Sequence, residues 1–414
     1  MQSPSPGIPR PILIAGLVVA AYEWALFISS MFAPGAIGPN YQGVGTDWMV
    51  FHGAARLLHG GNLAILYDGG RFTAYLNATF APYLFDPVEY RPWVNPPWFL
   101  LAVAPFGLLG FIASYSAGQL LQYAGWTTVL RKAGRCNLGK RELRCAIAIG
   151  LVSPALALNA LCGQTAPLVA TLALLVLGTG PRSEWLAGAA LALITFKPQF
   201  GPVLVVYLIA SRQWGVLGRA VLAGVLLVAA SIIVLGITPW IDWLKVIAQG
   251  LSGEGSWNAA ARLWGNSVFA CLALSGVPTG IATALQNLVS LGSLVAAWVI
   301  TRRDMNYPRR TGALILLMLL AAPYFAGYDA VLALSALMVA YLGDPRLMPR
   351  SLHGWTVPLL VWVIPFYSPP ALNPIGRITP LIIAAALIQL YRAGRHWLPA
   401  SATPPTASTP EATA

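Results

Sequence analysis

The sequence predicts an all-α polytopic membrane protein, a helical bundle with about twelve crossings. Hydrophobic residues make up 57% of the 414 residues and charged residues only 9%, whereas a soluble protein carries roughly a quarter charged residues. The apolar residues form long continuous runs, which are typical of membrane helices rather than of a barrel. Because lipid cannot satisfy backbone polar groups, these runs must fold as helices.

The net charge of +12 comes from short basic clusters between the apolar runs, at 131–144, 301–310, 344–350 and 391–396. Such clusters mark cytoplasmic loops, because Lys and Arg resist translocation. We therefore expect a multi-pass protein of the inner (plasma) membrane with both termini inside and no nucleic-acid partner. The four cysteines show neither a disulfide framework nor the spacing of a zinc motif.

The first span is the apolar run 11–32, whose core of about 20 residues is longer than that of a signal peptide. A first external loop, 33–95, follows and contains interfacial helices. Residues 96–110 are expected to form a re-entrant piece, because Pro105 interrupts them, and residues 112–130 cross the membrane. The membrane domain is expected to cover 1–398, and the Pro/Ala/Thr/Ser tail 399–414 is expected to be disordered and cytoplasmic.

The remaining spans include several short apolar segments, which alternate with polar tips. The expected segments are 143–159, 167–179, 185–196, 201–211, 215–236, 281–300, 311–322, 330–342, 355–366 and 377–391, with a second external loop at 237–265. Segments of 12–15 residues fall short of the roughly 20 that cross the hydrocarbon layer. Their tips must therefore lie inside a water-filled cavity.

Three tips, "LCGQTAP" (161–167), "FKPQF" (196–200) and "PYFAGYD" (323–329), all point toward the outer face. Their convergence predicts a cavity that is open to the outside. The polar residues expected to line it are Asn159, Gln164, Lys197, Gln199, Tyr328 and Asp329.

Asp47 begins the helix-patterned segment "TDWMVFHGAARLLH" (46–59) after the first span. It suits a helix cap and also a catalytic carboxylate at the membrane surface. His52, Arg56 and His59 share one face of this helix. A metal site would need a further ligand that the sequence does not supply, so this face is interpreted as the wet side of an amphipathic interfacial helix.

Lys197 lies within an apolar segment, where a charge is costly and therefore suggests a function. Three roles stay open: snorkelling to the interface, binding a lipid-linked phosphate, or an ion pair with Asp329. The external segments 86–100 and 256–269 combine aromatic residues with Arg and Asn, including Arg262 and Asn266. This composition suits an aromatic belt at the interface and equally the binding of a sugar.

Two functions fit a cavity that opens outward, and the family resemblance described next implies the lipid-linked sugar in both: a transferase of lipid-linked sugars, or a transporter or flippase of them. A transporter is typically built from internal repeats, and no clear repeat is found in the sequence. An assembly subunit would not explain a lysine and an aspartate within short hairpins. Motifs for nucleotide binding are absent from the sequence, so neither a nucleotide donor nor a cofactor is expected.

The ordered motifs "GTDWMVFHGAARLLHGGNLAILYD", "NPPWFLLAVAPFGLL", "NALCGQTAPLVATLALL", "ITFKPQFGPVLVVYLIASRQW", "LWGNSVFACLAL" and "LAAPYFAGYDAVLAL" span about residues 40–345. In this order they resemble glycosyltransferase family 87, the polyprenol-phosphate-mannose-dependent mannosyltransferases of the GT-C fold. The resemblance implies a polyprenyl-phosphate sugar donor, usually of mannose, a glycolipid or glycan acceptor, and inversion at the anomeric carbon.

The resemblance further implies that Asp47 is the general base, because it matches the carboxylate position in the first external loop. Lys197 or Arg262 would then stabilise the departing phosphate, which makes a metal unnecessary. Members that modify phosphatidylinositol mannosides carry histidines where this chain has "APYFAGYD". The phosphoinositide acceptor is therefore not transferred to this chain.

Overall fold

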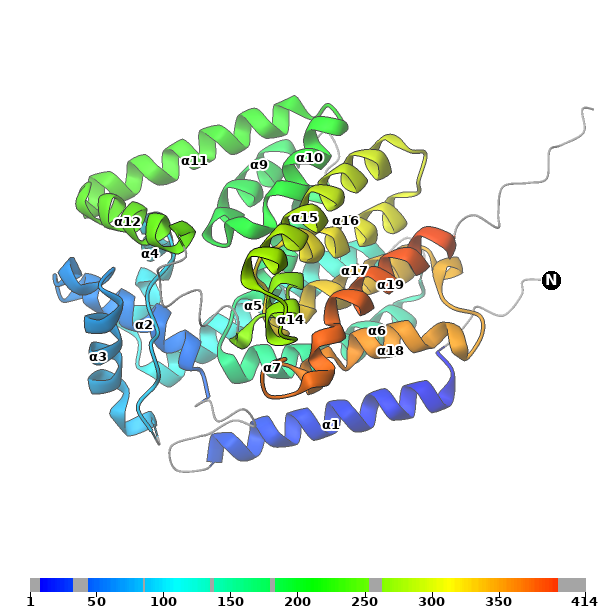
Figure 1. Ribbon diagram of the computed structural model, residues 1–414, viewed down its shortest axis with the longest axis horizontal. Coiled ribbons are helices and arrows are strands. Elements are labelled where there is room, and N and C mark those ends of the chain that lie inside the picture. The colour runs from blue at the N-terminus through cyan, green and yellow to red at the C-terminus, as the bar shows by residue number, and fades with distance from the viewer. Residues whose placement is uncertain are drawn as a thin grey trace, which may run out of the picture.

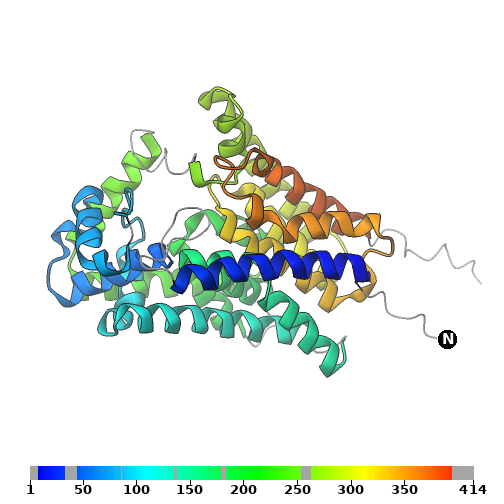
Figure 2. The ribbon, with the colours of Figure 1, turned by 90° about the horizontal axis from the view of Figure 1, so that it is seen from below.

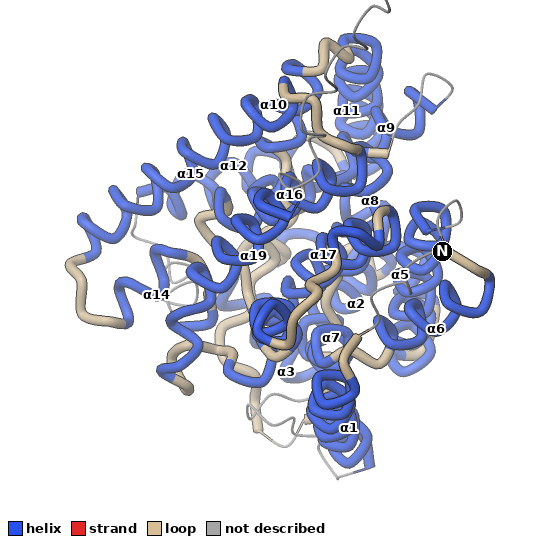
Figure 3. Tube along the Cα trace, turned by 90° about the vertical axis from the view of Figure 1, so that its right-hand side faces the viewer, coloured by secondary structure: helices blue, strands red, loops and turns tan. Residues whose placement is uncertain are grey.

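The computed structural model describes residues 8–32, 44–84, 86–134, 138–178, 183–252 and 263–393. In these residues the chain is helical, and its extended pairing is limited to an isolated bridge between Gly265 and Ala326 (Figure 3). Two long helices, α1 (Arg10–Phe32) and α11 (Trp214–Leu235), lie on opposite sides of the bundle (Figure 1). Helices α2 (Thr46–His59), α3 (Gly69–Phe80) and α12 (Thr238–Ser252) gather at one end of the molecule, at the left of Figure 1.

Four helical stretches are long and apolar enough to cross a membrane: 10–29, 214–235, 279–302 and 374–393. They belong to α1 (Arg10–Phe32), α11 (Trp214–Leu235), α15 (Thr279–Arg302) and η11 (Pro374–Ile378) with α19 (Thr379–Ala393). On α11, Ile233 is 83% exposed and Val221 67% exposed. Exposed aliphatic surface of this extent needs a lipid environment. The chain is therefore a helical, multi-pass membrane protein.

A fifth crossing arises if α6 (Lys140–Leu151) and α7 (Pro154–Cys162) count as one span, bent by 46°. The sequence predicted a crossing segment at 143–159, and the bend at residues 152–153 was not foreseen. Pro154 lacks a backbone donor, and Ser153 caps the new helix by accepting a hydrogen bond from the Leu156 amide at 3.3 Å. The predicted count of about twelve crossings remains a prediction.

The shorter helices form the centre of the bundle. From Thr311 to Ala321, α16 (Tyr307–Ala321) is buried on every side, and it packs against α17 (Ala330–Gly343). Helix α8 (Ala166–Leu177) is buried almost as fully and contacts α5 (Phe111–Gly134). Helices that are apolar all round belong in a core. The long helices enclose this core, and α1 runs along one side of it (Figure 2).

The predicted external loop contains the expected helices, α2 and α3, followed by α4 (Pro97–Val103) and η3 (Ala104–Leu108). The amphipathic interpretation of α2 was wrong at His52. This side chain is fully buried, while Arg56 and His59 are exposed. Helix α2 is enclosed because α3, α4 and α5 pack around it. Part of the second predicted loop is the helix α12.

The other elements connect or complete the bundle. They are η1 (Leu63–Ile65), η2 (Ala81–Tyr83), α9 (Glu184–Leu193), η5 (Ile194–Phe196), η6 (Pro198–Phe200), α10 (Pro202–Ala210), α14 (Val268–Leu274), η7 (Gly327–Asp329), η8 (Pro345–Leu347), η9 (His353–Trp355), α18 (Thr356–Trp362) and η10 (Ile364–Tyr367). The predicted tail 399–414 and the predicted site residue Arg262 lie outside the described residues.

Candidate functional site

Asp47 lies in the first turn of α2, where the partial positive charge of a helix N-terminus favours a carboxylate. The cap itself is Gly45, in the left-handed conformation (φ 73°). Its amide donates a hydrogen bond to the Leu161 carbonyl at 2.7 Å, which joins the start of α2 to the end of α7. The interpretation of Asp47 as the cap was therefore wrong, and its carboxylate is free to bind other side chains.

Two side chains from distant segments meet this carboxylate. Gln164 donates from Nε2 to Asp47 Oδ2 at 2.8 Å. On the other side, Arg91 Nε lies 3.9 Å from Asp47 Oδ1. The two charged side chains are 21% (Arg91) and 17% (Asp47) exposed. Each carboxylate oxygen of Asp47 thus has its own neighbour.

The tip that carries Gln164 is held in place by buried amides. Asn159 donates to Gln119 Oε1 at 2.9 Å and accepts from the Ala166 amide at 3.1 Å. Gln119 in turn donates to the Gln164 carbonyl at 3.3 Å. Asn159 is fully buried, so it braces the turn between α7 and α8. The sequence predicted it as a cavity-lining residue instead.

A second cluster joins the other two predicted tips. Lys197, between η5 and η6, places Nζ 3.2 Å from Asp329 Oδ1 and 5.0 Å from the centre of the Tyr328 ring. Asp329 Oδ2 accepts from the Ala326 amide at 3.0 Å. Both charges are enclosed, with Lys197 14% and Asp329 2% exposed. The predicted ion pair is confirmed, and the snorkelling interpretation of Lys197 was wrong.

The contacts around Asp47 and those around Lys197 lie next to the same region of the protein. Asp47, Arg91 and Asp329 all act electrostatically on the Tyr324 hydroxyl group and on the Cys162 thiol. Tyr324 and Tyr328 share a side-chain hydrogen bond, and α7 packs against η7. The ends of α2, η5 and η7, together with the extended segment that carries Arg91, therefore bring two carboxylates and two cations into one region. The predicted convergence of the tips is present, while the water-filled cavity stays a prediction.

The other predicted residues make different contacts, although Asn266 bonds the tip that carries Tyr324 and Gln199 follows Lys197 by two residues. Asn266 is buried; its backbone amide donates to the Phe325 carbonyl at 2.7 Å, and its side chain bonds Thr379 and Ser368. Gln199 is half-buried on η6. Arg56 is exposed on α2.

His52 lies five residues after Asp47 on α2, and its side chain contacts other groups. Its Nδ1 lies 3.0 Å from Ser114 Oγ and 3.1 Å from the Phe106 carbonyl oxygen. Burial, with a smaller effect from Arg56, lowers the pKa of His52 below its usual 6.5. The imidazole is therefore neutral at pH 7 and serves the packing of α2 rather than the site.

Sequence reasoning missed Arg91 and Tyr324. Arg91 lies in the extended segment 86–96. Its backbone amide donates a hydrogen bond to Thr73 Oγ1 at 2.9 Å. Its only signal was an arginine among the aromatic residues of the first external loop. Tyr324 belonged to the quoted tip "PYFAGYD", but nothing in the sequence set it apart from Tyr328.

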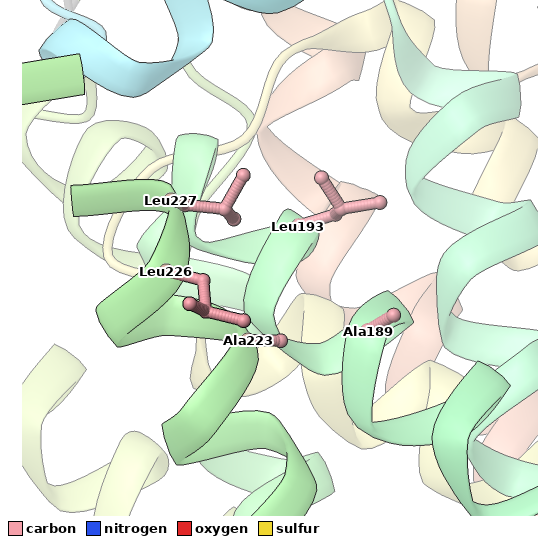
Figure 4. A pocket seen from close by; sticks show the side chains of 5 residues that line it. All are labelled: Ala189, Leu193, Ala223, Leu226 and Leu227. Atoms are coloured by element: carbon pink, nitrogen blue, oxygen red, sulfur yellow. The ribbon is translucent and has the colours of Figure 1, made fainter. Parts of the chain in front are cut away.

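Two mainly apolar cavities lie in the bundle. A groove of about 300 Å³ between α9 and α11 is lined by Ala189, Leu193, Ala223, Leu226 and Leu227 (Figure 4). A second cavity of about 190 Å³ separates α2 and α4 from α5 and α8, and Gln122 and Thr165 are its polar lining residues. Surfaces of this kind suit a hydrocarbon chain. Among the described residues, no group of three or more His, Cys, Asp or Glu side chains could hold a metal ion.

Comparison with known proteins identifies the family of the chain. Residues 93–323, more than half of the chain, match the model of glycosyltransferase family 87. Neither the curated proteins nor the solved structures contain a match. The family membership favours a transferase over a transporter. The chain belongs to glycosyltransferase family 87, and it is a membrane glycosyltransferase.

Proposed function

We propose that this glycosyltransferase transfers mannose from a polyprenyl-phosphate donor to a glycolipid or glycan acceptor at the outer face of the plasma membrane. The anomeric carbon is inverted, and Asp47 is the general base. The observation that carries the proposal is the Asp47 carboxylate. It is held through one oxygen by Gln164 and lies next to the partly enclosed cation of Arg91, and the Lys197–Asp329 pair joins two neighbouring helix ends.

This geometry suits a single displacement. Asp47 accepts the proton of the acceptor hydroxyl group as the acceptor oxygen bonds to the anomeric carbon. The bond from that carbon to the phosphate oxygen breaks on the opposite side, and its electron pair leaves with the phosphate. Because attack and departure occur on opposite faces, the configuration inverts. A nearby cation stabilises the charge that develops on the phosphate.

The lipid part of the donor also finds a suitable surface. The groove between α9 and α11 is apolar, and η5 leads from its residue Leu193 to Lys197. A hydrocarbon chain in this groove would remain within the bilayer while its phosphate approached the polar tips. Short central helices fit this design, because α8 begins two residues after Gln164 and α17 begins directly after Asp329.

The test uses the purified full-length protein in liposomes with labelled polyprenyl-phosphate-mannose and a mixed glycolipid acceptor. We expect transfer of mannose from this donor and not from GDP-mannose, and NMR of the product should show the opposite anomer from the donor. Transfer from the nucleotide sugar, retention of configuration, or movement of the donor across the bilayer without transfer would overturn the proposal. Polyprenyl-phosphate-glucose serves as the control for the choice of sugar.

A further inference from the structure

The two cations of the site differ in how fully their charge is compensated. Lys197 lies 3.2 Å from Asp329 Oδ1 and faces the Tyr328 ring, and Asp329 has a further hydrogen bond from Ala326. Withdrawing Lys197 would leave an almost fully buried carboxylate without its cation, which is strongly unfavourable. Lys197 is therefore committed to Asp329.

Arg91 is less tightly held. Its Nε lies 3.9 Å from Asp47 Oδ1, which is beyond hydrogen-bond distance. This Nε is buried and lacks a hydrogen-bond partner among the described residues. A buried donor without a partner favours binding of an acceptor that satisfies it. The planar guanidinium group matches phosphate oxygens better than a lysine does.

We propose that Arg91, and not Lys197, binds the phosphate of the lipid donor, and that this binding prepares Asp47 for catalysis. The inference rests on the proposed function, since it concerns the same site. When the phosphate draws the guanidinium group away, Asp47 Oδ1 loses its cationic neighbour. Gln164 still holds Oδ2. Oδ1 then accepts the proton of the acceptor hydroxyl, and donor binds before acceptor.

Arg91 thus takes part in both halves of the displacement. In the reaction the bond between the anomeric carbon and the phosphate oxygen breaks, and its electron pair stays on the phosphate bound to Arg91. The acceptor oxygen forms the new bond, and its proton passes to Asp47 Oδ1. Neither an oxidant nor a further reactant is required.

The direct test measures binding of polyprenyl monophosphate and of the uncharged polyprenol to the full-length protein in nanodiscs. Wild type should prefer the phosphate. In Arg91→Gln, the preference for the phosphate over the polyprenol should fall about 10- to 100-fold, as expected for the loss of hydrogen bonds to a charged group. Arg91→Lys should recover part of it. Arg71→Gln changes an exposed arginine of α3 and should bind as wild type.

Two further variants separate Arg91 from the other charges. Asp47 competes with the phosphate for Arg91, so Asp47→Asn should bind polyprenyl monophosphate more tightly than wild type. The double variant Lys197→Gln/Asp329→Asn removes the second pair as a whole and should keep the preference. Loss of the preference in the double variant, or weaker binding by Asp47→Asn, would contradict the assignment.

The experiment also distinguishes the inference from the proposal beneath it. If wild type binds the phosphate and the polyprenol equally, the proposed donor class is wrong. If wild type prefers the phosphate and Arg91→Gln retains that preference, only the role of Arg91 is overturned.

Discussion

The two oxygens of the Asp47 carboxylate have different neighbours, and this difference assigns them different tasks. Oδ2 accepts a hydrogen bond of 2.8 Å from Gln164, and Oδ1 lies 3.9 Å from Arg91 Nε. The first contact fixes the orientation of the carboxylate. The second oxygen remains able to accept a proton. A general base needs both features, because its reach and its free lone pair decide whether proton transfer occurs.

Removing the first contact should slow the reaction without abolishing it. We expect Gln164→Leu to lower kcat by about 10- to 100-fold, equivalent to one charge-assisted hydrogen bond of about 1.5–3 kcal/mol. The KM for the donor should change little, because Gln164 does not hold the phosphate. Initial rates of sugar transfer measure both constants. Gln389→Leu, at the other end of the bundle, is the matched control; an unchanged kcat in Gln164→Leu would contradict the assigned role.

His52 should make the stability depend on pH. Burial lowers its pKa in the folded protein, so the unfolded chain binds the proton more strongly than the folded one. Its contribution to stability is complete above the unfolded pKa of about 6.5 and decreases as the pH falls below that value. When the pH is lowered from 7.5 to 5, the Tm of His52→Asn should therefore fall less than that of wild type. Equal slopes in His52→Asn and wild type would refute this role of His52.

Among single residues, the sequence predicted those that stand out by their charge. Asp47, Lys197 and Asp329 stood out because a charge within an oily segment is costly. Arg91 could not be recognised, since an arginine in a predicted external loop is ordinary until the loop folds back on Asp47. His52 was misjudged because its helical spacing with Arg56 and His59 suggested one wet face. Spacing does not show that other helices cover that face.

Among the elements, the turn between α7 and α8 positions the site most directly. Gly163 has φ 75°, and a Cβ there would lie 2.7 Å from Trp48 Cβ and 3.0 Å from Gly45 Cα. Only a glycine allows α7 to end against α2 at this distance. The close approach brings Gln164 to Asp47.

Gly163→Ala should therefore separate the two helices. We expect a loss of about 1–3 kcal/mol in stability together with a strong loss of transfer activity. Thermal unfolding in detergent and initial rates provide the two measurements. Gly218→Ala lies in α11, where a Cβ has nothing within 4 Å, so it should retain both properties. Wild-type behaviour of Gly163→Ala would show that the turn tolerates a side chain.

Most element boundaries were predictable, because apolar runs end where polar tips or basic clusters begin. The predicted segments 215–236 and 281–300 agree closely with α11 and α15. The break between α6 and α7 was missed, although Ser153 and Pro154 form a typical start of a helix. An apolar run conceals such a break, since both pieces share its composition. The enclosure of α2 depended on packing with α3, α4 and α5, which periodicity does not describe.

Over the whole molecule, long helices with exposed aliphatic side chains enclose a core of short, fully buried helices. This arrangement allows the bundle to face lipid while polar groups meet inside it. It also explains why composition predicted the class, whereas the crossing count remained a prediction. A short helix can end at the site or cross the bilayer with a neighbour, and hydropathy does not distinguish the two.

Labelling from one side of the membrane tests the predicted orientation. Asp86 is exposed in the first loop, and Cys145 is exposed near the predicted cytoplasmic start of α6. A membrane-impermeant maleimide should label Asp86→Cys in intact cells and should reach Cys145 only after lysis. Cys145→Ala in the same background controls for the native thiol. Labelling of Cys145 in intact cells would reverse the orientation and place the carboxylate of Asp47 on the cytoplasmic side.

The central claim is that Asp47 is the base of a lipid-linked sugar transfer. Its most direct test is transfer of labelled mannose from polyprenyl-phosphate-mannose by equally abundant wild type, Asp47→Asn and the exposed control Asp86→Asn. Because asparagine still accepts the Gln164 hydrogen bond but takes no proton, we predict a loss of at least about 100-fold in Asp47→Asn. Asp86→Asn should retain full activity. Full activity in Asp47→Asn would contradict the account.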